Sequence, residues 1–168
     1  MYEDLDLYIG VKIVGLKPMS RADYNDHRGW ALPDSEDGDE EGYLVEYKDG
    51  GKPNHPEHLG YISWSPKEVA DKAYRLTEGM TFGMAVEALK LGYKVARKGW
   101  NGKGMYVLLM DGYPLGVPAN AETAVKHRLA VGGIVKIAPY LTIMTAQGTV
   151  STWAPSVNDA LADDWAIV

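Results

Sequence analysis

The helix and strand signals of this sequence form two sets of short segments, one on each side of Gly79. Each set combines strand-like runs with a few short helix signals, and no segment is long enough to organise a larger fold. Short strands that follow one another along the chain usually pair antiparallel through tight connections. We therefore predict an α+β protein of two small modules, residues 1–77 and 78–168, each an antiparallel sheet with one or two short helices.

The first module carries clear start signals for its elements. Ser20 is a predicted N-cap for a short helix ending near His27. Ser65 is a predicted N-cap for a second helix ending near Leu76, with Pro66 at its first position and Glu68 completing a capping box. Strands are expected at residues 8–16, 43–47 and 59–64, with an acidic surface loop at 30–42 and a turn at 49–51.

The second module begins with a helix capped by Thr81 and ended by Gly92. Asn101-Gly102 predicts a tight turn between two strands. Ser156 or Asn158 is expected to cap a last short helix that ends near Asp163. Strands are expected at 93–97, 105–110, 134–138, 140–145, 150–153 and 165–168, and residues 111–133 are interpreted as an insertion with a helix at 121–129.

Composition narrows the classes of function. Of 168 residues, 46% are hydrophobic and 24% charged, as in an ordinary soluble globular protein. The absence of cysteine excludes disulfides, thiolate metal sites and a cysteine nucleophile, and fits a reducing cytosol. No apolar run approaches the roughly 18 residues of a membrane span, so we expect no membrane partner.

The net charge of −6 is unevenly distributed. Residues 1–77 contain 9 Lys and Arg against 16 Asp and Glu, whereas residues 78–168 contain 8 against 7. Neither part has the density of basic residues that neutralises the phosphates of a duplex, so a nucleic-acid polymer is not the expected partner. The nearly neutral second part is compatible with a small phosphate-bearing ligand.

Two tryptophans in the second module are the main candidates for ligand contact. Trp100 and Trp153 each lie at a predicted strand end, beside short polar residues. An exposed indole can stack on a nucleobase, which is worth about 1–3 kcal/mol. Each indole could equally be a core or interface side chain. Arg97 could bind a pyrophosphate through its guanidinium, or form a structural ion pair.

Four short polar residues lie beside these tryptophans in the sequence, and could read a base edge or ribose hydroxyls. Residues of this kind also occur at turns and helix caps for local reasons, and for Ser156 the cap is the safer interpretation. The four are Asn101, Ser156, Asn158 and Asp159. Trp165 is expected in the core.

The His55-Pro56-Glu57-His58 motif offers two imidazoles and a carboxylate in four residues. Helical metal motifs place two histidines at i and i+4, whereas Pro53 and Pro56 favour a loop here. We therefore predict no metal site and no cofactor. The second module offers only His127 and scattered carboxylates, so no catalytic residue is predicted either.

Several motifs of the second module occur together in the order known from one family. They are Thr81-Phe82-Gly83, Ala88-Leu89, Arg97-Lys98-Gly99-Trp100, Pro139-Tyr140-Leu141, Trp153-Ala154-Pro155-Ser156 and Leu161-Ala162-Asp163-Asp164-Trp165. Residues 78–168 thereby resemble the phage-encoded Thoeris anti-defence family of the second type. Residues 114–133 make this module longer than the shortest members. Residues 1–77 lie outside the resemblance; they are similar to a module of unknown function that recurs in phage proteins.

The resemblance implies a non-enzymatic protein that acts in the cytoplasm of the infected bacterial host. It would bind the cyclic ADP-ribose isomer made by TIR-domain immune enzymes, glycocyclic ADP-ribose, and keep this signal from its effector. It also implies a homotetramer with ligand sites between protomers, and for some relatives binding of cyclic dinucleotides of CBASS immunity. An enzyme that degrades such a nucleotide, or a protein–protein interaction module, are the alternatives.

Overall fold

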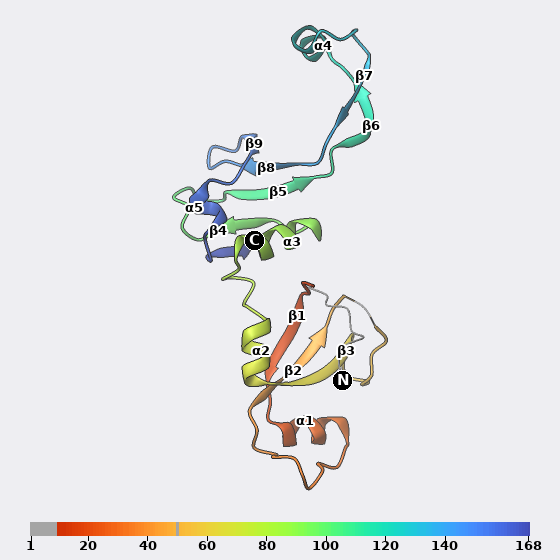
Figure 1. Cartoon of the computed structure of the whole chain (residues 1–168), viewed down its shortest axis with the longest axis vertical. Coiled ribbons are helices and arrows are strands. Elements are labelled where there is room, and N and C mark those ends of the chain that lie inside the picture. The colour runs from red at the N-terminus through yellow and green to blue at the C-terminus, as the bar shows by residue number, and fades with distance from the viewer. Residues whose placement is uncertain (1–9, 50) are drawn as a thin grey trace, which may run out of the picture. The chain divides into compact units, whose positions relative to one another are not determined.

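The computed structural model describes residues 10–49 and 51–168 of the chain. The chain divides into two compact units, one ending at Arg75 and one comprising Leu76–Val168. Each unit contains antiparallel sheet and short helices, which confirms the predicted α+β class (Figure 1). Within the described residues, no helix combines the length and apolar character needed to cross a membrane.

In its described residues, the first unit is a three-stranded sheet with two helices. Its strand order is β1-β2-β3, with both pairs antiparallel. Its small core consists of Tyr24, Leu44 and Ile62, with Met19 and Trp64 packed against them. The elements are β1 (Val14–Pro18), α1 (Arg21–Arg28), β2 (Gly42–Tyr47), β3 (Tyr61–Pro66) and α2 (Lys67–Ala73).

The predicted cap of α1 is confirmed, and the predicted cap of α2 is wrong. Ser20 accepts a hydrogen bond from the backbone N–H of Asp23, as expected. Ser65 does not cap α2, because β3 continues through Pro66, which pairs with Gly42 and is itself the N-cap residue. Strand pairing therefore holds Ser65 in extended backbone, one position too early to reach the helix.

Two further boundaries of the first unit differ from the prediction. The helix expected to reach Leu76 ends at Ala73, and the strand expected at 8–16 begins only at Val14. Residues 8 and 9 of that expected strand, and Gly50 of the expected turn at 49–51, lie outside the described residues.

Gly60 sits where the backbone of β2 passes very close to the chain that enters β3. A Cβ at Gly60 would overlap the carbonyl oxygen of Tyr47, so only glycine fits. The Gly60 N–H donates to the Glu46 carboxylate at 3.2 Å, and the N–H of Leu59 donates to the same oxygen at 3.1 Å. Glu46 thus anchors the irregular loop of residues 51–60 to the sheet.

The second unit contains a five-stranded antiparallel sheet in the order β10-β4-β5-β8-β9. Helix α3 begins at the predicted cap, since Thr81 accepts from the N–H of Met84. The core lies between α3 and the sheet, and Trp165, with no exposed surface, is its largest fully buried side chain. The elements of this sheet and its helices are α3 (Phe82–Lys90), β4 (Val95–Arg97), β5 (Tyr106–Met110), β8 (Tyr140–Met144), β9 (Val150–Trp153), α5 (Val157–Ala160) and β10 (Trp165–Ile167).

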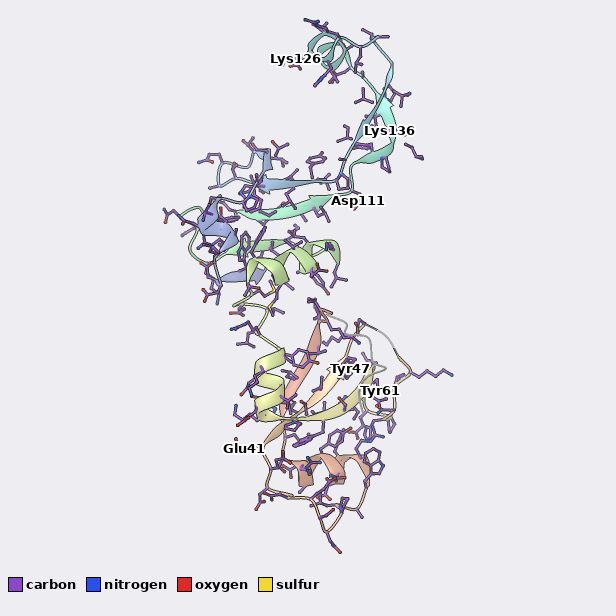
Figure 2. All side chains as sticks on the ribbon, viewed as in Figure 1. Glu41, Tyr47, Tyr61, Asp111, Lys126 and Lys136 are labelled. Atoms are coloured by element: carbon purple, nitrogen blue, oxygen red, sulfur yellow. The ribbon has the colours of Figure 1, made fainter. Side chains whose placement is uncertain are left out.

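Residues 111–139 form an arm between β5 and β8. It consists of a two-stranded ribbon, β6 (Tyr113–Pro118) and β7 (Ile134–Ile137), joined by helix α4 (Ala121–His127). Figure 1 shows the arm extending beyond the end of the five-stranded sheet, and Figure 2 places Asp111 at its base and Lys126 and Lys136 along it. Several of its large apolar side chains are exposed, among them Leu115 at 91% and Ile134 at 65%.

The arm corresponds to the segment interpreted as an insertion, and its elements differ in part from those predicted. Its helix is present, but β6 was not predicted. The expected strand at 134–138 is present as β7, where it pairs with β6 rather than with the main sheet. The apolar residues of β6 do alternate, but Pro114, Gly116 and Pro118 lie between and after them, and residues of these types favour turns over strand interiors.

Three other boundaries of the second unit need correction. The strand expected at 93–97 begins at Val95, because the N–H of Tyr93 still bonds to Ala88 at the end of α3. The connection after β4 is longer than the expected two-residue turn at Asn101-Gly102 and runs to Met105. The last helix, α5, ends at Ala160 rather than near Asp163.

Candidate functional site

An aromatic cluster lies where β4, β9 and β10 bring three tryptophans together. The ring centroids of Trp100 and Trp153 are 6.2 Å apart, and those of Trp100 and Trp165 are 5.5 Å apart. Phe82, at the start of α3, completes the cluster at 5.4 Å from Trp165. Trp165 is fully buried, as predicted, whereas Trp100 and Trp153 are half-buried and rest on it.

The two half-buried indoles meet edge to face. The planes of Trp100 and Trp153 are inclined by 71°. A planar base cannot be sandwiched between rings at this angle, but it can stack on one indole while the other contacts its edge. The tryptophan pair therefore offers one stacking face and one wall.

Asp159 is the polar centre of the site. One of its carboxylate oxygens accepts from Trp100 Nε1 at 3.2 Å and from Arg97 Nη1 at 3.0 Å. The other accepts from the backbone N–H and the hydroxyl of Ser156, at 3.1 and 2.7 Å. Ser156 in turn accepts from the Asp159 N–H and so caps α5, which confirms Ser156 as the N-cap. One carboxylate thus fixes a helix start, an indole and a guanidinium.

The pKa of Asp159 reflects these contacts. Burial on its own would raise this pKa, but the hydrogen bonds from Ser156, Arg97 and Trp100 outweigh burial and lower it to about 2. Asp159 is therefore a carboxylate at neutral pH. An acid this strong is a poor general base, because proton transfer is efficient only when the pKa lies near the working pH.

Arg97 is held between two carboxylates. Its Nε donates to Asp164 Oδ1 at 2.7 Å, and its Nη1 donates to Asp159. Asp164 also accepts from the N–H of Gly99 at 2.8 Å, and the bond from Arg97 is the main cause of its lowered pKa. The side chain of Arg97 is only 19% exposed. In this arrangement two carboxylates balance the positive charge of the guanidinium, which leaves less of that charge available to a ligand phosphate.

The remaining predicted residues lie on the rim. Asn101 is exposed in the loop after Trp100. Asn158 is exposed on α5, and its carbonyl oxygen accepts from Arg97 Nη1 at 3.4 Å. The structure thus brings Arg97, Trp100, Trp153, Ser156 and Asp159 into one cluster, with Asn101 and Asn158 at its margin.

Sequence reasoning missed two residues that organise this cluster. Asp164 pairs with Arg97 across 67 positions, and Phe82 packs against both Trp153 and Trp165. The two consecutive aspartates before a buried tryptophan were a usable signal for Asp164, since an acid beside a core strand usually has a partner.

The first unit contains two further features of chemical interest. A cavity of about 570 Å³ is lined in part by Arg21 and Arg28, which stack on Trp64 and Trp30 at 4.2 and 4.1 Å. Beside α1, the ring nitrogens of His27, His55 and His58 converge within 4.8 Å of one another. Burial lowers the pKa of His27, and the neighbouring imidazoles of His55 and His58 lower it further.

Comparison with known proteins places the second unit in a family. The Thoeris anti-defense 2-like domain matches residues 80–168. The chain is also similar to the protein named Thoeris anti-defense 2 of Bacillus phage SP01, with 37% identity over 89 residues. That alignment covers 53% of this chain and 94% of the phage protein. The matched segment contains the whole five-stranded sheet, the aromatic cluster and the arm. The chain therefore belongs to the Thoeris anti-defense 2-like family.

Proposed function

We propose that the second unit binds the cyclic ADP-ribose isomer produced by TIR-domain enzymes, glycocyclic ADP-ribose, and sequesters it without chemical change. The protein would thereby inhibit Thoeris defence in the cytoplasm of an infected bacterium. Family membership supports the anti-Thoeris role, and the observation that carries the binding mode is the half-buried pair of Trp100 and Trp153.

The site is preorganised for a flat, polar ligand. Trp100 is fixed on one side by the bond from its Nε1 to Asp159 and on the other by Trp165. A ring that is already ordered loses little entropy when a base stacks on it, so more of the stacking energy remains as affinity. A cyclic ligand gains in the same way, because its riboses and pyrophosphate are already held together.

The charges around the site favour binding over catalysis. Asp159 and Asp164 both accept hydrogen bonds from Arg97. The bond from Arg97 is the main cause of the lowered pKa of Asp164, and bonds from Ser156, Arg97 and Trp100 together lower the pKa of Asp159. Neither carboxylate is suited to withdraw a proton from water, which hydrolysis of a nucleotide would need. Polar contacts to the ligand would come from the rim, where Asn101 and Asn158 are exposed.

A second protomer would complete the site. A signal near micromolar concentration is removed only by a nanomolar dissociation constant, which corresponds to about −12 kcal/mol. One indole face and a shallow rim do not supply this, whereas a wall from another copy would enclose the ligand. The exposed apolar residues of the arm, such as Leu115 and Ile134, provide surface for such an assembly. We therefore propose a homotetramer.

The test is a titration followed by recovery of the ligand. The full chain is incubated with glycocyclic ADP-ribose, and the released nucleotide is analysed by mass after heat denaturation. We expect tight binding and recovery of unchanged ligand, with linear ADP-ribose and NAD binding at least a hundredfold more weakly. A cyclic dinucleotide competitor measures whether CBASS signals are bound as well, and light scattering measures the assembly.

Each alternative predicts a different outcome. Time-dependent conversion of the ligand would make the protein an enzyme. Absence of binding to every nucleotide would favour an interaction module in which the tryptophans are interface anchors.

A further inference from the structure

We infer that the first unit contains a binding site for a divalent transition-metal ion, formed by His27, His55 and His58. His27 lies in the last turn of α1, whereas the other two lie in the loop between β2 and β3. The site is independent of the nucleotide-binding function proposed for the second unit.

Two of the three ring nitrogens already have nearly the spacing that a metal requires, and the third lies close to them. His27 Nε2 and His58 Nε2 are 2.9 Å apart, and all three candidate ligand nitrogens lie within 4.8 Å of one another. Tetrahedral zinc with bonds of about 2.0–2.1 Å holds its nitrogen ligands roughly 3.3–3.4 Å apart. The first pair needs to separate by only a few tenths of an ångström. The ring of His55 packs on that of His27 with 4.2 Å between centroids, so His55 must reorient to direct a nitrogen at the ion.

Glu46 orients the ring of His58, as carboxylates next to metal-binding histidines commonly do. Its Oε2 lies 3.5 Å from His58 Nδ1, while its Oε1 is fixed by the N–H groups of Leu59 and Gly60. A carboxylate at Nδ1 favours the tautomer that carries its proton there, which leaves the Nε2 lone pair free. In His58 that nitrogen is the one that faces His27.

The other two histidines can adopt the same state at low cost. The contact between the Glu57 N–H and His55 Nδ1 is long, at 3.3 Å, so releasing it frees either nitrogen of His55. The 2.9 Å contact between His27 and His58 requires one ring to donate, and a change of tautomer in His27 replaces that bond with a bond to the metal.

The donor set indicates which ions fit. Imidazole suits zinc, copper, iron and nickel, whereas magnesium and calcium prefer oxygen ligands. Three histidines leave a fourth tetrahedral position for water. The rings are half-buried, so an ion can enter from solvent and would tie the irregular loop of residues 51–60 to α1.

The chain supplies its own control. His127 is the fourth and last histidine of the sequence, and it is exposed on α4 in the second unit. The metal-free full chain is titrated with Zn²⁺ in competition with a chromophoric chelator. We expect one zinc ion per chain, affinity at least about 100-fold weaker in His27→Ala, His55→Ala and His58→Ala, and no change in His127→Ala.

Glu46→Gln tests positioning separately from coordination. The glutamine oxygen can still accept from the loop N–H groups, but the charge that favours the His58 tautomer is lost. We expect zinc affinity to fall by about tenfold, with the far-UV circular dichroism unchanged. A purely structural glutamate would leave the affinity unaltered in this variant.

Spectroscopy covers the case in which a histidine variant fails to fold. In the unmodified protein, Zn²⁺ should shift the imidazole proton and nitrogen resonances of His27, His55 and His58 and leave those of His127 unmoved. Equal zinc affinity in all four alanine variants, or resonance shifts confined to His127, would overturn the proposal.

Discussion

Replacement of Asp159 by alanine should destabilise the second unit more than any other change to an exposed or half-exposed carboxylate there. The side chain is 13% exposed and accepts four hydrogen bonds, two from Ser156 and one each from Arg97 and Trp100. Loss of a charge-assisted bond costs about 1.5–3 kcal/mol, and loss of half a capping box about 0.5–1 kcal/mol. Because Arg97 keeps Asp164, it is not left unpaired.

The lowered pKa of Asp159 gives a second, independent value for the stability that this carboxylate contributes. A fall from the ordinary 3.8 to about 2 corresponds to roughly 2 kcal/mol of stability at neutral pH. Since the pKa is lower in the folded state, this stability is complete above about pH 4 and is lost as the pH falls toward 2. The two approaches together predict a loss of about 2–3 kcal/mol, or a fall of about 10 °C or more in the melting temperature of a unit of this size.

The assay is thermal unfolding followed by near-ultraviolet circular dichroism, together with the indole N–H resonance of Trp100. The matched control is Asp163→Ala, which removes an exposed aspartate four positions away. Asp159→Asn should lose most of the stability that the Asp159 carboxylate contributes. In this variant the free energy of unfolding should also fall less steeply between pH 4 and 2. A loss below about 0.5 kcal/mol in Asp159→Ala, or an equal loss in the control, would refute the role of this network.

Four other variants test separate parts of the molecule. Trp100→Ala and Trp153→Ala should each weaken nucleotide binding at least about tenfold by calorimetry; because both rings rest on the core, melting temperatures must be measured alongside, and unchanged affinity would move the site elsewhere. Gly60→Ala should destabilise the first unit by about 1–3 kcal/mol in urea unfolding, because its Cβ would overlap Tyr47; wild-type stability would mean that the backbone can separate there. Replacement of residues 113–137 by a short turn should leave the indole resonances of the sheet unchanged, since Met110 and Tyr140 already pair across the gap; a collapse of those resonances would make the arm part of the fold.

The parts of the fold that could be predicted from the sequence are those set by neighbouring residues. Ser20, Thr81 and Ser156 were identifiable as caps because a cap bonds to a backbone N–H three positions away. Ser65 has the same local signature, yet the pairing of Gly42 with Pro66 decides its conformation. Strand pairing is not visible in a window of four residues.

In the candidate sites, too, features set by neighbouring residues could be predicted, and contacts between distant segments could not. Trp100 and Trp153 could be identified as candidates because each lies near a predicted strand end beside polar residues. The bonds that fix Arg97, however, join it to residues 62 and 67 positions away. Likewise, His55 and His58 could be recognised as a motif in the sequence. The position of His27 beside them could not, because it depends on how α1 packs on the sheet. Contacts between distant segments require the fold to be known first.

The pairing of β10 also has a consequence for the order in which the protein can form. The ribosome releases a chain from its amino end, so the first unit has all its elements once residues up to Arg75 have emerged. The second unit must wait, because Trp165, the largest side chain in its core, belongs to the last strand, and Met80 at its beginning pairs with that same tryptophan. During synthesis α3, β4 and β5 therefore remain without the side chain that fills their core until β10 has emerged from the ribosome. A premature stop before Trp165 would leave a folded first unit attached to a second unit that lacks the largest side chain of its core. Products of this kind are removed by cellular proteases.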